Sequence, residues 1–112
     1  MKLLTAVIKP HKVDDVKAAL QGAGVHGLTV TDVVGSGRQS GHTEVYRGVE
    51  YQVDLLPKRK IEVLCTDGDA DRVLEVLVGA ARSGSIGDGK VWIAEVAKVV
   101  RVRTGELDVD AI

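Results

Sequence analysis

Phenylalanine is absent from this chain of 112 residues, whose aromatic side chains are two tyrosines and one tryptophan. Small RNA-binding sheets hold bases by stacking them on aromatic rings, so this scarcity argues against a nucleic-acid-binding domain. The formal net charge of −1, from 15 basic and 16 acidic residues, gives no overall basic field that would attract a polyanion. We therefore expect no direct contact with nucleic acid, and any site for an anion has to be local.

Cysteine and long apolar runs are also scarce. The single cysteine, Cys65, cannot form an internal disulfide, and the alternation of Ile61, Val63 and Cys65 predicts that it is a buried apolar residue. No stretch is apolar for long enough to span a membrane, and the N-terminus lacks a signal-peptide pattern. We expect one cytoplasmic domain over residues 1–112, which would reach a membrane only through a protein partner.

Strand and helix patterns follow one another as two similar halves. Four β-favouring runs and a shorter fifth one lie at residues 2–9, 28–35, 60–66, 91–96 and 98–104. Apolar residues recur at helical spacing within 13–23 and 70–81, and Asp69 stands at the N-cap position of the second helix. The order βαββαβ predicts an α+β, ferredoxin-like fold, with an antiparallel sheet and both helices on one face. A doubly wound parallel sheet would need a helix between the second and third strands, where none is indicated.

A long glycine-rich loop, at about residues 36–57, separates the second and third predicted strands. Loops of this kind in hairpins are usually about two to five residues long, so we expect this one to have a function. The alternative is an extended two-stranded arm that packs in an oligomer, which does not exclude a function.

The segment SGSIGDGKVW, residues 83–92, has the G-x-x-x-x-G-K spacing of a Walker A motif at Gly84, Gly89 and Lys90. Val91 stands where that motif needs a hydroxyl group for magnesium, and the segment leads from a helix into a strand, the reverse of a P-loop. We therefore predict that it is not a P-loop. Gly87 and Gly89 still allow backbone N–H groups to converge on an anion beside Lys90, although a turn that binds no ligand is the alternative.

Two arginines lie in the fifth β-like run. On a strand, Arg101 and Arg103 would project from one face, and their guanidinium groups suit phosphate or carboxylate oxygens. A solvated charged face is the alternative interpretation.

Three segments together resemble the diagnostic loops of the PII signal-transduction proteins, the GlnB/GlnK type: GRQSGHTEVYRGVEY at 37–51, SGSIGDGKVWIAEV at 83–96 and VRVRTGE at 100–106. The resemblance covers essentially the whole chain, including the opening MKLLTAVIKPHKVDDVKAAL. It implies a ferredoxin-like homotrimer that binds ATP or ADP between subunits, and 2-oxoglutarate with Mg²⁺ beside ATP. It also implies a nitrogen regulatory protein, not an enzyme, that docks on targets such as an ammonium transporter or a nucleotidyltransferase.

The resemblance also implies roles for particular residues. In the loop at about 83–90, the nucleotide phosphates would be held by Gly87, Asp88, Gly89 and Lys90. Arg38 would join them from the long loop, while Arg101 and Arg103, in the C-terminal loop at about 101–112, would reach them from the neighbouring subunit. The base and ribose region would be lined by Val7, Gly35, Glu62 and Leu64.

The same resemblance implies which residues contact 2-oxoglutarate and Mg²⁺. Gln39 would bind the Mg²⁺ that joins ATP to 2-oxoglutarate, and Lys58 and Gly87 would contact the acid. Tyr51 matches the residue that many members have uridylylated or adenylylated. Ser36, Ser40 and Val49 depart from the common pattern of the long loop, so the resemblance does not fix the conformation of this loop or its choice of partner.

Two other classes of protein remain open at this point. A small phosphoryl-transfer enzyme would use the loop at about 83–90, with Asp88 or Glu62 as its candidate base. A ferredoxin-like nucleic-acid-binding module is disfavoured by the scarcity of aromatic residues and the near-neutral charge.

Overall fold

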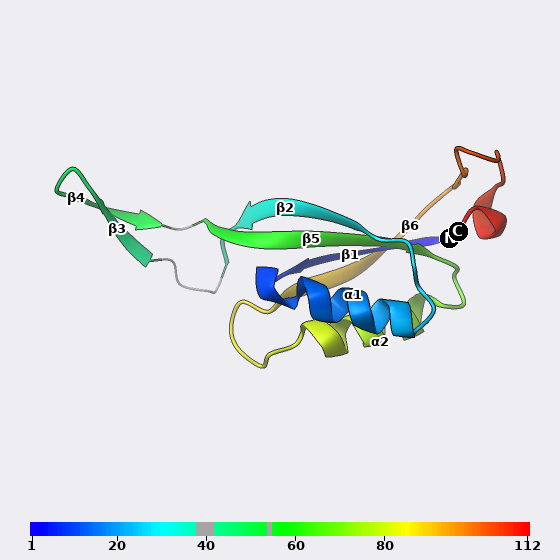
Figure 1. The fold of residues 1–112 in the computed structure, drawn as a ribbon, viewed down its shortest axis with the longest axis horizontal. Helices are drawn as coiled ribbons and strands as arrows, with labels where there is room; N and C mark the ends of the chain where they lie inside the picture. The colour runs from blue at the N-terminus through cyan, green and yellow to red at the C-terminus, as the bar shows by residue number, and fades with distance from the viewer. Residues whose placement is uncertain (38–41, 54) are drawn as a thin grey trace.

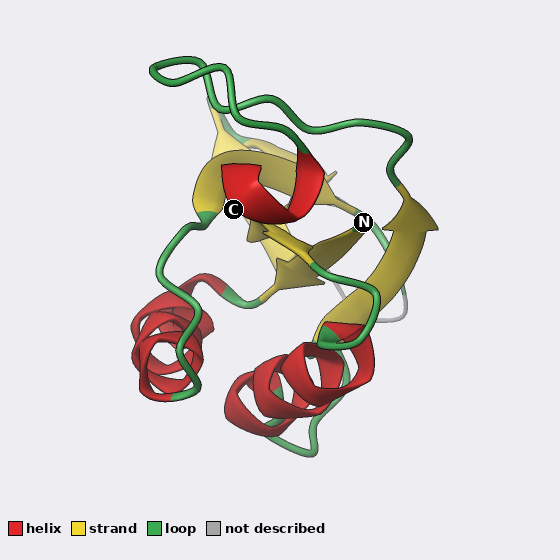
Figure 2. Ribbon diagram, turned by 90° about the vertical axis from the view of Figure 1, so that its right-hand side faces the viewer, coloured by secondary structure: helices red, strands yellow, loops and turns green. Residues whose placement is uncertain are grey.

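The computed structural model describes residues 1–37, 42–53 and 55–112; at 42–44 and 51–53 it describes the backbone alone. Four strands form an antiparallel sheet in the order β2-β5-β1-β6, with β1 at Lys2–Ile8, β2 at Thr29–Gly35, β5 at Leu56–Cys65 and β6 at Gly89–Glu95. Two helices, α1 (Val13–Gly22) and α2 (Ala70–Ala81), connect them and lie together on one face of the sheet (Figure 2). The α+β, ferredoxin-like fold is confirmed.

The core lies between the sheet and the helices. Alternate residues of the central strands face the helices, so Leu4 and Ile8 of β1 and Ile61 and Val63 of β5 are at most 1% exposed. The helices contribute the apolar residues that recur at helical spacing: Val16, Leu20, Val73 and Leu77. Cys65 belongs to this core and is 4% exposed, so its expected burial is confirmed.

A two-stranded arm extends beyond the sheet between β2 and β5 (Figure 1). Its strands are β3 (His42–Tyr46) and β4 (Val49–Val53), joined by a tight turn in which Arg47 and Gly48 have φ values of 53° and 78°. The arm that was the alternative for the long loop is therefore present, and its packing in an oligomer stays a prediction. Because β5 begins at Leu56, the end of the expected loop is already part of the sheet.

One local expectation is confirmed in position only, and another is wrong. Asp69 stands at the N-cap position of α2, as expected, but its side chain makes no capping hydrogen bond and pairs instead with Arg72 at 3.5 Å, because the backbone of Asp69 is already helical. Residues 98–104 form no strand. Gly105, with a φ of 74°, allows a turn in which the Arg101 N–H donates to the Glu106 carbonyl oxygen at 2.9 Å, so Arg101 and Arg103 do not share a strand face.

The remaining elements are short. A 3-10 turn, η1 (Pro10–Lys12), precedes α1, and another, η2 (Asp108–Ala111), ends the chain. Among the described residues, no helix is long and apolar enough to cross a membrane.

Candidate functional site

The face of the sheet opposite the helices carries both charged and apolar side chains. In the antiparallel register, Lys60 of β5 and Lys90 of β6 lie on either side of Val7 of β1. Directly opposed residues of an antiparallel sheet point to the same face, so the two ammonium groups flank Val7. Two residues further along, Trp92 lies opposite Thr5 and is 48% exposed. This open face therefore has a basic end, while in its middle the polar Thr5 lies between Trp92 and Glu62.

The glycine loop, residues 83–88, precedes β6 at the basic end of the open face. The carboxylate of Asp88 closes this loop. Its Oδ2 atom accepts the backbone N–H groups of Ser83 and Gly84, both at 2.8 Å, and its Oδ1 atom accepts the Ser83 hydroxyl. The Nζ atom of Lys9, just after β1, lies 3.2 Å from the same Oδ1. The bonds from the Ser83 hydroxyl and the loop backbone hold the pKa of the Asp88 carboxyl well below its usual range.

Two glycines give the loop its path into β6. Gly87 and Gly89 have φ values of 96° and 98°, which side chains disfavour. A Cβ atom on Gly89 would lie 1.7 Å from the carbonyl oxygen of Val7, so this position also needs glycine because the two strands approach closely. The loop leads from a helix into a strand, which confirms that the G-x-x-x-x-G-K spacing here is not a P-loop.

Lys58 joins the glycine loop to β5. Its Nζ atom donates to the carbonyl oxygen of Gly87 at 2.9 Å, and the residue is 9% exposed. Burial, and then the positive charge of Lys9, lower the pKa of Lys58, while the charge of Asp88 opposes this shift. Gly35 is adjacent, because a Cβ atom there would lie 4.0 Å from Cγ of Lys58. A bound anion at this point would find a buried ammonium group that already lacks part of its hydration.

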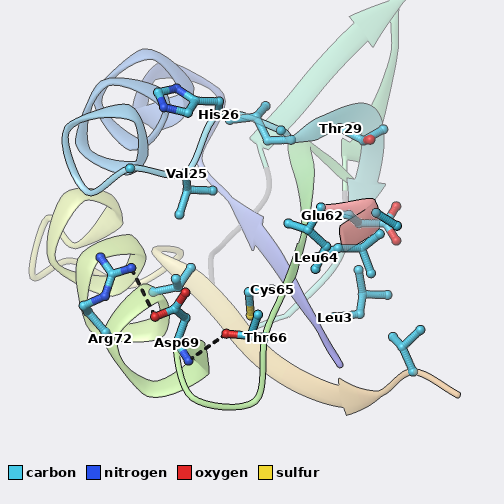
Figure 3. A pocket seen from close by; sticks show the side chains of 17 residues that line it. Leu3, Val25, His26, Thr29, Glu62, Leu64, Cys65, Thr66, Asp69 and Arg72 are labelled. Carbon is cyan, nitrogen blue, oxygen red and sulfur yellow. Dashed lines mark hydrogen bonds and ion pairs between the residues drawn. The ribbon is translucent and has the colours of Figure 1, made fainter. Parts of the chain in front are cut away.

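A cavity of about 920 Å³ lies at the other end of the sheet, between the start of β2, the end of β5 and the chain's C-terminus (Figure 3). Glu62 and Leu64 line it together with Thr29, which lies directly opposite Glu62 in the sheet. Figure 3 shows Asp69 and Arg72 on another wall. There the Arg72 guanidinium donates to the carbonyl oxygen of Ala23 at 2.8 Å and so ties α2 to the end of α1.

The C-terminal segment, residues 99–112, makes bonds mainly within itself. The Arg101 guanidinium lies 3.3 Å from the Glu106 carboxylate and also 3.3 Å from the carbonyl oxygen of Ile112. The Asp108 carboxylate accepts the backbone N–H of Val99 at 3.0 Å. The backbone N–H of Asp108 in turn donates to the carbonyl oxygen of Val99 at 2.8 Å. Figure 1 shows this segment and the loop before β6 at opposite ends of the sheet.

The expected site residues thus fall into several groups. The structure gathers one group around the glycine loop: Val7, Gly35, Lys58, Gly87, Asp88, Gly89 and Lys90. Glu62 and Leu64 lie in the cavity, and Arg101 and Arg103 lie beyond the far end of β6. Arg38 and Gln39 are outside the described residues, and Tyr51 is placed in β4 by its backbone alone.

Sequence reasoning gave no role to Lys9, Ser83 or Thr29, which belong to these groups. Their signals were present but weak: Lys9 ends a strand next to the glycine loop, Ser83 begins that loop, and Thr29 pairs with a residue already selected. Within the described part of the chain, no three His, Cys, Asp or Glu side chains gather as metal ligands. The expected Mg²⁺ ligand, Gln39, lies outside that part, so the metal site stays a prediction.

Comparisons with known proteins give one consistent result. Residues 1–106 match the family described as "Nitrogen regulatory protein P-II". The chain is 54% identical to the "Nitrogen regulatory protein P-II" of Rhizobium meliloti and 54% identical to that of Klebsiella oxytoca. It is 53% identical to the "Nitrogen regulatory protein GlnK" of Escherichia coli. Each of these three matches covers 100% of both chains.

Proposed function

The chain belongs to the P-II family of nitrogen regulatory proteins and has a regulatory signalling role, which we propose it performs by sensing ATP, ADP and 2-oxoglutarate. In this proposal the nucleotide binds between the subunits of a homotrimer, and 2-oxoglutarate binds beside ATP with a Mg²⁺ ion held by Gln39. The bound ligands then control how the β3–β4 arm docks on target proteins.

The observation that carries the nucleotide part is the cluster of cations around the glycine loop. Lys90 and Lys60 point to the open face on either side of Val7, and Lys58 and Lys9 lie beside the loop itself. Ammonium groups next to a glycine-rich backbone turn are the donor set that phosphate oxygens require. The lowered pKa of Lys58, caused mainly by its burial, gives a reason for an anion to bind there, because a negative charge would favour its charged form.

The position of the C-terminal arginines supports an oligomeric site. The seven residues of β6 separate the glycine loop from the C-terminal segment, a length of about 20 Å at about 3.3 Å per residue. Arg101 and Arg103 therefore lie too far from Lys90 of their own chain to share one phosphate group with it. In a homotrimer, the C-terminal segment of a neighbouring subunit supplies these guanidinium groups to the loop.

The same contacts favour a regulatory protein over a phosphoryl-transfer enzyme. Asp88, a candidate base, has both carboxylate oxygens engaged by donors within its own loop and by Lys9. Those bonds lower its pKa, which makes it a weak proton acceptor. Glu62 lies 3.6 Å from Lys60 on the sheet, at the cavity rather than at the glycine loop.

The arm is the proposed docking element. Near its turn, Val45, Tyr46 and Val49 are each more than half exposed, and the Arg47 guanidinium lies 5.3 Å from the centre of the Tyr46 ring. Such an exposed, largely apolar tip suits insertion into a partner such as an ammonium transporter or a nucleotidyltransferase in the cytoplasm. Nucleotidylation of Tyr51 on β4 would add a bulky anion to the arm and block that docking.

Complementation between two variants tests the shared site. The single variant Lys90→Ala changes the half of the site that the glycine loop supplies. The double variant Arg101→Ala, Arg103→Ala changes the half that the C-terminal segment supplies. By calorimetry, each variant alone should bind ATP about 100-fold more weakly, because charge-assisted hydrogen bonds to phosphate are lost. Co-expressed with different tags and purified through both tags, mixed trimers should regain tight binding, since each has a site formed by two intact halves.

Lys17→Ala, Lys98→Ala is the matched control, because it removes two exposed positive charges from elsewhere on the chain. It should bind ATP like the unchanged protein. If the purified mixed trimers bind no better than either variant alone, the two halves do not meet between subunits.

The proposed 2-oxoglutarate site is tested separately. Calorimetric titration of 2-oxoglutarate should show binding to protein preloaded with Mg²⁺ and ATP, and much weaker binding to protein without nucleotide, since a divalent cation has to offset the repulsion between the anions. Equal binding with and without ATP would contradict the bridged site.

A further inference from the structure

We propose that the Asp88 carboxylate is a positioning group, which holds the glycine loop and Lys9 in their binding arrangement before any anion arrives, instead of contacting the phosphates itself. The proposal rests on the proposed function only for the identity of that anion. It follows from where the two oxygens of this carboxylate point and from which groups they bind.

Both oxygens point back into the loop. Oδ2 accepts two consecutive backbone N–H groups, those of Ser83 and Gly84, at 2.8 Å each. Oδ1 accepts the Ser83 hydroxyl and pairs with Lys9 at 3.2 Å, while Lys9 also donates to the Ser83 hydroxyl oxygen at 3.1 Å. One side chain thus closes the loop from its last residue to its first and fastens it to the end of β1.

The loop needs such a closure because its glycines do not by themselves favour one conformation. Gly84 and Gly87 both adopt positive φ values, and glycine in an unconstrained loop has many other conformations available. A loop that has to be ordered when the ligand binds loses affinity, and a loop ordered beforehand does not. The Asp88 bonds therefore act on ligand affinity through the backbone of the loop.

The carboxylate also keeps two ammonium groups near one another. The charge of Lys9 lowers the pKa of Lys58 and the charge of Asp88 raises it, so Asp88 offsets the repulsion between these two lysines. An anion that approaches Lys58 meets a site whose own negative charge is already paired with Lys9. This explains how an acidic residue is accommodated in a site for anions.

Asp88→Asn is the primary test, because it keeps the size of the side chain and removes its charge. In ligand-free protein, the amide hydrogens of Ser83 and Gly84 should exchange with solvent at least ten-fold faster than in the unchanged protein. The dissociation constant for ATP should rise about ten-fold. Saturation with ATP should restore the slow exchange, because the ligand then orders the loop that the carboxylate no longer holds.

Two further variants separate positioning from general stability. Asp71→Asn removes an exposed carboxylate from the first turn of α2, away from the loop, and should leave both exchange and ATP binding unchanged. Ser83→Ala removes one of the bonds to Asp88 and should weaken ATP binding about three-fold. The double variant should be no weaker than Asp88→Asn alone, because both changes release the same closure.

The outcomes distinguish this proposal from the proposed function. If ATP and inorganic tripolyphosphate fail to bind the unchanged protein, the proposed function is wrong, and the exchange rates still decide whether Asp88 orders the loop. If Asp88→Asn exchanges like the unchanged protein, the loop does not need this carboxylate and the positioning role is wrong. Faster exchange with undiminished ATP affinity also contradicts it, as does an additive effect of the two substitutions on binding.

Discussion

The glycine loop at 83–88 and the C-terminal segment at 99–112 carry the two halves of the proposed phosphate site, and they are held in different ways. Each is tied by an aspartate: Asp88 accepts two backbone N–H groups in the loop, and Asp108 accepts one in the C-terminal segment. The glycine loop is in addition fixed to the sheet, by Lys58 and by the close approach of Gly89 to Val7.

The C-terminal segment is tied mainly to itself, because the isolated bridge between Val100 and Leu107 and the bond from the Arg101 guanidinium to the Ile112 carbonyl oxygen both lie within it. Val102 is 98% exposed there. One half of the proposed site is therefore built by the fold of a single chain. The other half is only locally ordered and is completed, in our proposal, by the surface of a second copy.

Substitution of Gly89 should loosen the glycine loop most strongly and so remove its difference from the C-terminal segment. In Gly89→Ala the new methyl group would collide with the Val7 carbonyl and the backbone would be strained at a φ of 98°, so we expect a loss of about 3 kcal/mol in the free energy of unfolding. Gly84→Ala is the matched control, since its φ is 85° but the space around it is open, and it should cost only about 1 kcal/mol.

Urea denaturation at one fixed protein concentration measures both variants, because oligomers change stability with concentration. Equal losses for the two glycines would mean that the contact with β1 does not anchor the loop.

Lys58 should produce the next largest effect, on how stability depends on pH. Burial lowers its pKa in the folded protein from the ordinary value of 10.5, so between the two pKa values the unfolded chain binds more protons than the folded protein. The free energy of unfolding should therefore rise as pH increases through that window toward 10.5, and this contribution should vanish in Lys58→Met.

Lys60→Met is the control for that measurement, since Lys60 lies on the same strand and its side chain is 36% exposed. It should keep the rise with pH, which can be followed by urea denaturation at a series of alkaline pH values. A profile for Lys58→Met that parallels the unchanged protein would show that Lys58 is not the group responsible.

Glu106, in the C-terminal segment, should give the smallest effect. Its carboxylate lies 3.3 Å from the Arg101 guanidinium, so in Glu106→Gln the arginine is released from an ion pair that competes with phosphate. Exposed ion pairs are weak, so we expect ATP to bind only about two- to three-fold more tightly by calorimetry. An Asp110→Asn variant, changed in the same segment, should bind ATP as before; weaker binding by Glu106→Gln would mean that Glu106 positions Arg101 for the ligand.

The fold could be predicted from the sequence because its elements are encoded locally. The period-two run from Ile61 to Cys65 and the helical spacing of Val73 and Leu77 each indicate one element, and their order admits one antiparallel arrangement. The glycine loop could also be separated from a P-loop by element order alone. The matching loops then indicated the family, which the comparisons confirm.

The contacts of the site could not be predicted in the same way. Lys9 and Asp88 lie far apart in the sequence, and only the register of β1 against β6 brings their side chains together. The run from Lys98 to Thr104 alternates like a strand, yet within the described residues only its Val100 forms a β-bridge, to Leu107 of the same segment, and Gly105 favours a turn. A segment with high β propensity does not form a strand where it has no partner strand to pair with.

Trp92 lies at the middle of the open face, opposite Thr5, and it is the sole tryptophan of the sequence. The emission of an indole moves to shorter wavelength as water is removed from around it, and a half-exposed ring has room for a large change. Any second copy that covers this face would therefore alter the intrinsic fluorescence of the protein. Trp92 would then report such an assembly without an added dye.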